Sequence, residues 1–185
     1  MGTVDLRKFD NDWYEPGRGL VLRTCWYLTN VIVFKSAIVI PFGFKQAVLR
    51  LFGAKIGQNV VIKPSVNIKY PWNLEVGDNS WIGEEVWIDS LAKVTIGKNV
   101  CVSQGAYLCA GSHDWSKVGF DLKIAEIALN DGCWVCAKAI VMGGSLVSSH
   151  SIVTAGSVLS GTTESYGIYS GNPAINVKTR HIEGP

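Results

Sequence analysis

Two different spacings of hydrophobic residues divide the chain at about residue 56. Before this point the longest apolar stretch runs from Leu20 to Phe44, and it predicts one helix over about 18–39 and a shorter one over about 43–52. The stretch contains no run of 18 uncharged apolar residues, which disfavours a membrane-spanning helix. It also begins too late for a signal peptide and lacks a small-residue cleavage site. We therefore expect residues 1–55 to form a helical cap or arm.

From residue 56 onward an aliphatic residue recurs every six positions. Blocks of three such positions repeat at a spacing of 20 residues, and two more blocks follow after an interruption. All fifteen positions are aliphatic: Ile56, Ile62, Ile68, Val76, Ile82, Ile88, Ile96, Val102, Leu108, Leu129, Val135, Val141, Val147, Val153 and Leu159. Four residues after each of them stands a second column that, apart from Trp72, contains only small or β-branched residues. A period of six is neither helical nor that of a simple strand, and it is typical of a hexapeptide β-solenoid.

This pattern predicts an all-β solenoid of about five triangular coils over residues 56–163. Three hexads close one coil, so the spacing of 20 implies a two-residue bulge at one corner, near 71–73 and again near 91–93. Four glycines follow an inward aliphatic residue: Gly57, Gly77, Gly83 and Gly97. We expect them at corners that require a positive φ, which glycine tolerates. Five coils give a prism about 24 Å tall, with the cap at one end and the tail, residues 164–185, covering the other.

The repeat is interrupted once, and we expect functional chemistry at the interruption. The third coil ends at Leu108 and the next begins at Leu129, about 13 residues later than the repeat predicts. The extruded loop, residues 111–128, begins with Gly-Ser-His-Asp-Trp. Loops that extend from a rigid scaffold commonly carry function, and His113 is an outward histidine at the root of this one. His113 is therefore a candidate general base, although an ordinary solvated histidine would give the same pattern.

Composition and charge refine this picture. Of the 185 residues 17% are charged, against a usual ~25%, which excludes a disordered chain and suits a continuous aliphatic interior. The net charge of +2 is too small to favour nucleic acid, but residues 1–55 hold eight Lys/Arg and four Asp/Glu. A basic and apolar cap suits peripheral contact with an anionic membrane, whereas the simpler interpretation is a cap packed on the solenoid.

The cysteines favour a reduced, cytoplasmic setting. There are five of them, without the paired spacing of a disulfide framework. Cys133 and Cys136 are spaced as in redox or zinc motifs, but we expect the first to face the core and the second a corner. No histidine stands at metal-ligand spacing, so we expect no metal site.

Several segments resemble the hexapeptide-repeat acyltransferases of left-handed β-helix fold, and specifically the sugar O-acetyltransferases. The resemblance covers almost the whole chain and is carried by residues 9–14, 49–54, 82–89, 103–107 and 171–174. It points in particular to the acetyltransferases assigned to colanic acid biosynthesis, with galactoside and maltose acetyltransferases as wider relatives. It implies left-handed coiling, a homotrimer with active sites between subunits, and acetyl-CoA as the co-substrate.

The resemblance also implies roles for individual residues. His113 would take the proton from a sugar hydroxyl as that oxygen attacks the acetyl-CoA thioester, and a backbone N–H would stabilise the oxyanion. Asp89, Ser112 and Asp114 would bind the acceptor. The positions matched to the coenzyme A site are Trp134, Ala137, Ala155, Gly156, Ser160 and Lys178. Of these, Trp134 would lie against the pantetheine arm, and Lys178 would meet the phosphates.

The chain departs from the family pattern at two expected phosphate contacts. Residues 160–163 read Ser-Gly-Thr-Thr where relatives often carry a Lys-Asp pair, and Ile175 replaces a basic residue. Two functions stay open. One is O-acetylation of a free or lipid-linked sugar in exopolysaccharide synthesis. The other is a non-catalytic scaffold, or an acyltransferase for a non-sugar acceptor. A carbonic-anhydrase-like trimer would need three zinc-binding histidines, and the loop region offers one outward histidine.

Overall fold

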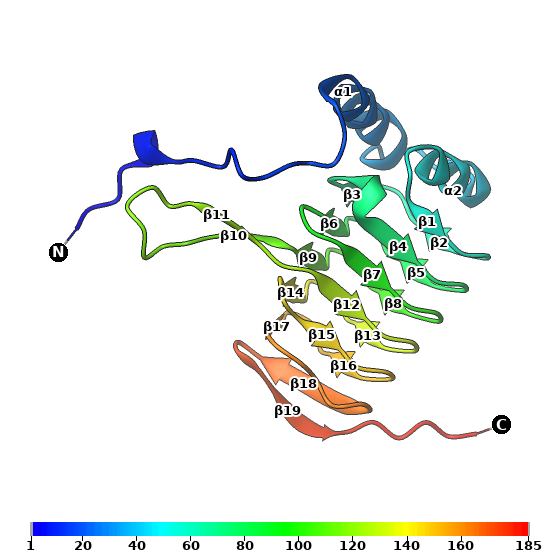
Figure 1. The fold of residues 1–185 in the computed structure, drawn as a ribbon. Coiled ribbons are helices and arrows are strands. Elements are labelled where there is room, and N and C mark those ends of the chain that lie inside the picture. The colour runs from blue at the N-terminus through cyan, green and yellow to red at the C-terminus, as the bar shows by residue number, and fades with distance from the viewer. Residues whose placement is uncertain (1, 185) are drawn as a thin grey trace.

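The computed structural model describes residues 2–184, which form a three-sided β-solenoid with helices across one end (Figure 1). Each side is a sheet of short strands contributed by successive turns. Face A contains β1 (Lys55–Ile56), β4 (Leu74–Val76), β7 (Val94–Ile96), β12 (Ile127–Leu129) and β15 (Leu146–Val147). Face B contains β2 (Val61–Ile62), β5 (Trp81–Ile82), β8 (Cys101–Val102), β13 (Trp134–Val135), β16 (Ile152–Val153), β18 (Gly167–Gly171) and β19 (Ala174–Thr179). Face C contains β3 (Asn67–Ile68), β6 (Trp87–Asp89), β9 (Tyr107–Cys109), β14 (Ile140–Met142) and β17 (Val158–Leu159).

Successive turns pair at the spacing that the repeat predicts. Glu75 pairs with Lys55 on one side and Thr95 on the other, each 20 residues away. Thr95 then pairs with Ala128, so the extruded residues lie between these two turns. Between the first and second turns the chain adds its extra corner residues as a short 3-10 turn, η3 (Pro71–Asn73), which is where a bulge was expected.

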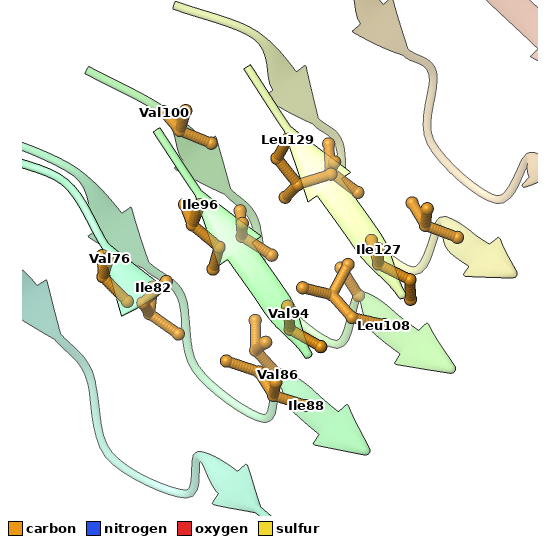
Figure 2. Packing of buried hydrophobic residues seen from close by; sticks show 14 of the residues in the cluster. Val76, Ile82, Val86, Ile88, Val94, Ile96, Val100, Leu108, Ile127 and Leu129 are labelled. Atoms are coloured by element: carbon orange, nitrogen blue, oxygen red, sulfur yellow. The ribbon is translucent and has the colours of Figure 1, made fainter. Parts of the chain in front are cut away.

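The repeating aliphatic residues form the core. Of the fifteen predicted inward positions all are buried except Ile56 in the first turn, which is partly covered. Figure 2 shows side chains from consecutive turns, such as Val76, Ile96 and Leu129, stacked along the inside of the prism. Burying each Val, Leu or Ile contributes about 1.5–3 kcal/mol, so this column is the main source of stability.

The corner glycines are required for a different reason from the one predicted. None of the four has a positive φ. A Cβ on Gly77 would lie 2.6 Å from the carbonyl carbon of Gly97 in the next turn, and one on Gly83 would lie 2.8 Å from the backbone nitrogen of Gln104. The left-handed conformation occurs two residues later, at positions such as Asn59 and Asn79 (φ 54° and 58°). The expectation of a positive φ at Gly57, Gly77, Gly83 and Gly97 was therefore wrong, and close approach between turns is the cause.

The first N-terminal helix is shorter than predicted, and the second lies within one residue of its predicted bounds. α1 (Leu20–Thr29) continues as a π-helical turn, η2 (Asn30–Phe34), and α2 (Phe42–Leu51) follows after a break. The helical backbone thus ends at Phe34, before residue 39, and Pro41 disfavours helical backbone at Ile40, which keeps this segment separate from α2. Ahead of these helices η1 (Leu6–Lys8) is a single 3-10 turn in an extended arm. No helix within residues 2–184 is long and apolar enough to span a bilayer.

These helices supply hydrogen bonds to the open edge of the first turn. The Trp26 indole N–H donates to the carbonyls of Ile68 and Lys69, at 3.0 Å each. The Lys45 ammonium is fully buried, which lowers its pKa, and it donates to the Lys63 carbonyl at 2.8 Å. Arg50 likewise donates to the carbonyls of Ile56 and Gly57. The edge carbonyls are paired by side chains because no further strand is available to pair them.

The tail does more than cover the far end. β18 pairs in parallel with β16, and β19 turns back on β18 in antiparallel register. β18 therefore extends face B beyond residue 163, and the solenoid has about six turns where about five were expected. The column of small residues contributes here as well, since the hydroxyl of Ser151, one of its members, donates to the Gly167 carbonyl at 2.9 Å.

Candidate active site

The extruded loop is an ordered β-hairpin. β10 (Gly111–His113) and β11 (Leu122–Ile124) pair in antiparallel register, with His113 opposite Leu122. The hairpin projects from the prism beneath the N-terminal arm (Figure 1). It ends earlier than the predicted limit of 128, because Ile127 and Ala128 already pair with β7.

The His113 ring is fixed from both sides. It stacks on Phe120 with 4.5 Å between ring centroids and an interplanar angle of 9°, and Phe9 of the arm lies 5.9 Å away on a tilt. The Nδ1 atom lies 2.9 Å from the Phe120 carbonyl oxygen. A carbonyl can only accept, so Nδ1 carries the proton in this contact. The Nε2 atom of the neutral ring then holds the lone pair, which is the form that a general base needs.

Asp89 lies beside the root of the hairpin. Its side chain is 8% exposed, and a Cβ on Gly111 would lie 3.2 Å from its Oδ2 atom. Burial raises the pKa of Asp89, while the charge of Lys69 acts in the opposite direction. The Tyr107 hydroxyl lies 3.5 Å from Oδ2, a long contact that leaves acceptor capacity free. Asp89 is thus available to accept a hydrogen bond from a bound hydroxyl.

Asp114 stabilises the turn of the hairpin through hydrogen bonds and an ion pair. Its carboxylate accepts from the Ser116 hydroxyl and backbone N–H, and it pairs with Lys123 at 3.1 Å. The Ser116 hydrogen bond and Lys123 lower the pKa of Asp114 to about 2. Its oxygens are therefore already engaged within the hairpin, and its predicted part in acceptor binding stays a prediction.

Ser112 and Ser160 line one open groove of about 500 Å³, together with Met142 and Gly143. The groove lies where the hairpin leaves the solenoid, so the structure brings a predicted acceptor residue and a predicted coenzyme A residue together. Trp13 of the arm also borders it. Both serine side chains are exposed and have no hydrogen-bond partner within residues 2–184.

The other predicted coenzyme A residues lie elsewhere on the chain. Ala137, Ala155 and Gly156 occupy the corners between faces B and C, where the Gly156 N–H donates to the Ala137 carbonyl at 3.0 Å. Gly156 has a φ of +70°, which by itself accounts for a glycine. Trp134 on face B is 41% exposed, and its indole N–H donates to Ser103 at 2.8 Å.

Lys178 is exposed on β19, opposite Ile168 of β18. It belongs to the far end of face B, whereas His113 projects from the corner between faces C and A. One chain alone therefore does not gather all the predicted site residues into a single cleft.

The aromatic residues around His113 were not singled out from the sequence. Phe9 reaches the ring because the arm runs along the hairpin tip, where the Asp5 N–H donates to the Val118 carbonyl at 2.9 Å. The contact joins residues more than 100 positions apart, which leaves no periodic signal in the sequence. The only available sign was that residues 9–14 match a family segment.

The cysteine pair has no redox character in this environment. Cys133 and Cys136 are both buried, and burial raises the pKa of their thiols to about 12 and about 11. The thiols stay protonated at neutral pH and are poor nucleophiles and ligands. Between residues 2 and 184, no three His, Cys, Asp or Glu side chains are grouped closely enough to hold a metal ion.

The comparisons with known proteins agree with this fold, and the chain belongs to the hexapeptide-repeat acetyltransferases. WcaF of Escherichia coli K12, an acetyltransferase assigned to colanic acid biosynthesis, is 36% identical to it over 155 residues, which cover 84% of this chain and 85% of WcaF. No family model matches the chain.

Solved structures share the fold. The hexapeptide-repeat acetyltransferase VCA0836 from Vibrio cholerae superposes with a TM-score of 0.78 at 18% identity, covering 86% of this chain and 90% of its own. A galactoside acetyltransferase solved with coenzyme A superposes with a TM-score of 0.74 at 17% identity, covering 88% of this chain and 84% of its own. At these identities the likeness concerns the fold alone.

Proposed function

We propose that the protein transfers an acetyl group from acetyl-CoA to a sugar hydroxyl, with His113 as the general base. The observation that carries this proposal is the hydrogen bond from His113 Nδ1 to the Phe120 carbonyl, which leaves the Nε2 lone pair free. Membership of an acetyltransferase family supports the reaction, and the names of WcaF and the galactoside acetyltransferase support a sugar acceptor in exopolysaccharide synthesis.

The reaction needs no acyl-enzyme. The acceptor oxygen attacks the thioester carbonyl while Nε2 takes its proton, so a C–O bond forms. The C–S bond then breaks, and the imidazolium returns the proton to the departing thiolate. Stacking on Phe120 keeps the ring in place through both proton transfers. Asp89 would accept a hydrogen bond from a neighbouring hydroxyl of the acceptor, and Ser112 would contact it from the hairpin.

Coenzyme A would lie along the corner between faces B and C and end at the hairpin of a neighbouring chain. Ala137, Ala155 and Gly156 have small side chains or none, so a ligand could approach the backbone at this corner. A Cβ on Gly156 would meet nothing within 4 Å, so the space beside it is open. Trp134 would pack on the pantetheine arm, and Lys178 would approach the phosphates. Ser160 lies in the hairpin groove with Ser112, so it would border the end of a coenzyme A that reaches this groove from a neighbouring chain. Ala137 is half-buried and the other five residues are exposed, so all of them can be reached by a bound coenzyme A.

A homotrimer would complete the site. The residues on the coenzyme A side and His113 stand on different corners of one prism. The hairpin also projects with Trp115 82% exposed at its tip, and Trp81 and Trp134 stand exposed on face B. Exposed tryptophans of this kind mark surfaces that become buried on association.

The test of the mechanism is His113→Ala. Turnover would be measured by mass spectrometry of acetylated product, on the best acceptor from a panel of free, nucleotide-linked and lipid-linked sugars. Losing a general base lowers the rate by about 10²–10⁴-fold, while acetyl-CoA binding by calorimetry stays unchanged. His150→Asn is the matched control, because His150 lies at a distant corner in a left-handed conformation (φ 60°) that asparagine tolerates. Near-normal turnover by His113→Ala, or no acetyl-CoA binding by the native protein at millimolar ligand, would contradict the proposal.

A peripheral membrane location is part of the same proposal. α1 and its continuation η2 expose the apolar side chains of Val21, Leu28 and Ile32, and α2 exposes Phe44 and Leu51. Arg18 and Lys35 lie near them in the sequence and add positive charge. An apolar surface with basic residues suits the surface of an anionic bilayer on the cytoplasmic side.

A further inference from the structure

A groove between the N-terminal arm and the solenoid leads to His113. We call it the arm groove. It measures about 520 Å³ and is lined by Phe9, Asp12, Tyr14, Arg23, Lys69 and Leu122 among others. Phe9 contacts the His113 ring, and Leu122 pairs with His113 in the hairpin, so one end of the groove opens beside the proposed base.

Two cations line this groove, and within residues 2–184 neither of them, Arg23 or Lys69, forms an ion pair. The Nε atom of Arg23 is buried and has no hydrogen-bond partner there. A buried guanidinium N–H without an acceptor is costly, so such a group normally meets one in the functional state. Arg23 and Lys69 also line a second hollow of about 360 Å³, beside Tyr27 and Trp87, and therefore stand between two open spaces.

The remaining polar groups limit what can bind. Asp12 is the acidic residue in the lining, and Asp89 faces Lys69 from the solenoid side. The Tyr14 hydroxyl already donates to the Leu91 carbonyl at 2.9 Å. A neutral sugar could bind Asp12 and Asp89 but would leave the Arg23 guanidinium unmatched. An anion with several oxygens would match it, since Arg binds phosphate through paired N–H groups and Lys adds a point charge.

We propose that the acceptor is a phosphate or diphosphate ester of a sugar, with its phosphate on Arg23 and Lys69 and its sugar toward His113. The inference rests on the proposed function and names the acceptor class for that site. Nucleotide sugars and lipid-linked sugar diphosphates share this chemistry. The second hollow would hold the first part of the nucleoside or lipid.

Binding can be measured apart from catalysis. The probes are inorganic pyrophosphate, UDP and farnesyl diphosphate, titrated calorimetrically into full-length protein that is saturated with coenzyme A, so that its phosphate site is already filled. The double variant Arg23→Gln/Lys69→Gln should bind the preferred probe about 10–100-fold more weakly, as expected for lost hydrogen bonds to charged groups. The control, Arg18→Gln/Lys63→Gln, removes the same charge from exposed positions outside the arm groove and should change binding by less than about twofold.

Preference for UDP would indicate a nucleotide sugar, and preference for farnesyl diphosphate would indicate a lipid-linked sugar. No binding of any probe to the native protein, or equal weakening in the control variant, overturns the inference. The His113→Ala protein should bind the probe with native affinity. If that variant stays active, the proposed mechanism fails while the phosphate site stands, so the two failures are distinguishable.

Kinetics provide a second readout. For a phosphorylated acceptor the double variant should raise KM about 10–100-fold and change kcat by less than about threefold, because the phosphate contact is the same in the ground and transition states. For the same sugar without phosphate, kcat/KM should change by less than about threefold. An equal loss on both acceptors would mean that the substitutions disturb His113 itself, and it would overturn the assignment.

Discussion

Single glycines set how closely consecutive turns of the solenoid approach each other. At Gly77 the backbone of the next turn occupies the space that a Cβ would need, with Gly97 atoms 2.6–2.7 Å away. These neighbours are backbone atoms paired in the sheets, so they cannot move aside as a flexible side chain would. The same close approach occurs at Gly57, Gly83 and Gly97, so the spacing of the first turns depends on it.

Replacing Gly77 by alanine should therefore destabilise the fold. Overpacking of this kind costs about 1–3 kcal/mol, and it would appear as a lower urea midpoint in circular dichroism. Gly43→Ala is the matched control. Gly43 lies in α2 with nothing within 4 Å of an added Cβ, so alanine there should stabilise by about 0.5–1 kcal/mol. An unchanged urea midpoint in Gly77→Ala would contradict this prediction, because it would mean that the turns can move apart without loss of stability.

Periodic residues were predictable and pairwise contacts were not. The aliphatic column and the position of His113 followed from the period of six, since each turn repeats the same local geometry. Lys45 donates a hydrogen bond to a backbone carbonyl of the first turn, and Phe9 lies beside His113. Both contacts join residues whose separation along the chain is unrelated to the repeat, so the repeat could not predict them. Of the coenzyme A residues matched by resemblance, Ser160 shares a groove with Ser112 of the hairpin, while the others stand elsewhere on the solenoid, and the sequence pattern could not reveal how they are placed relative to His113.

The N-terminal helices have two faces with different tasks. The inner face donates side-chain hydrogen bonds to backbone carbonyls of the first turn, from Trp26, Lys45 and Arg50. The outer face exposes Val21 and Leu28, by 78% and 54%. Deleting residues 1–55 would remove both faces together and uncover the edge of the solenoid, so point substitutions on the outer face are the better test of membrane contact.

The full-length protein should float with vesicles that contain phosphatidylglycerol and less with pure phosphatidylcholine. The triple variant Val21→Gln/Leu28→Gln/Ile32→Gln should reduce flotation at least about tenfold, because each lost apolar side chain weakens insertion. Ile175→Gln/Val177→Gln/Ile182→Gln is the control, with equally exposed apolar residues in the tail. If the helix variant instead lowers the molecular mass in light scattering and leaves flotation unchanged, the outer face binds another copy of the chain.

At the scale of the assembly, active sites between chains can be tested by complementation. His113→Ala removes the proposed base, and Ala155→Trp places a large ring at an exposed corner on the proposed coenzyme A side. Each variant alone should be inactive. Subunits of the two variants, unfolded and refolded together, should recover about a quarter of native activity if each site draws one part from each of two chains, since random assembly pairs intact parts with that frequency. Mixtures that stay inactive would mean that both parts come from the same chain.

The closed ends of the prism also bear on how the protein behaves at high concentration. A solenoid is a stack of strands that could in principle continue from one molecule into the next, with each exposed edge serving as a template for another chain. Here side chains from α1 and α2 donate hydrogen bonds to the edge carbonyls of the first turn. At the other end, β19 pairs with β18 in antiparallel direction and so reverses the strand direction at the edge of face B. The first turn and the last turn of face B therefore offer no matching parallel edge, so the strands of face B cannot continue from one molecule into the next.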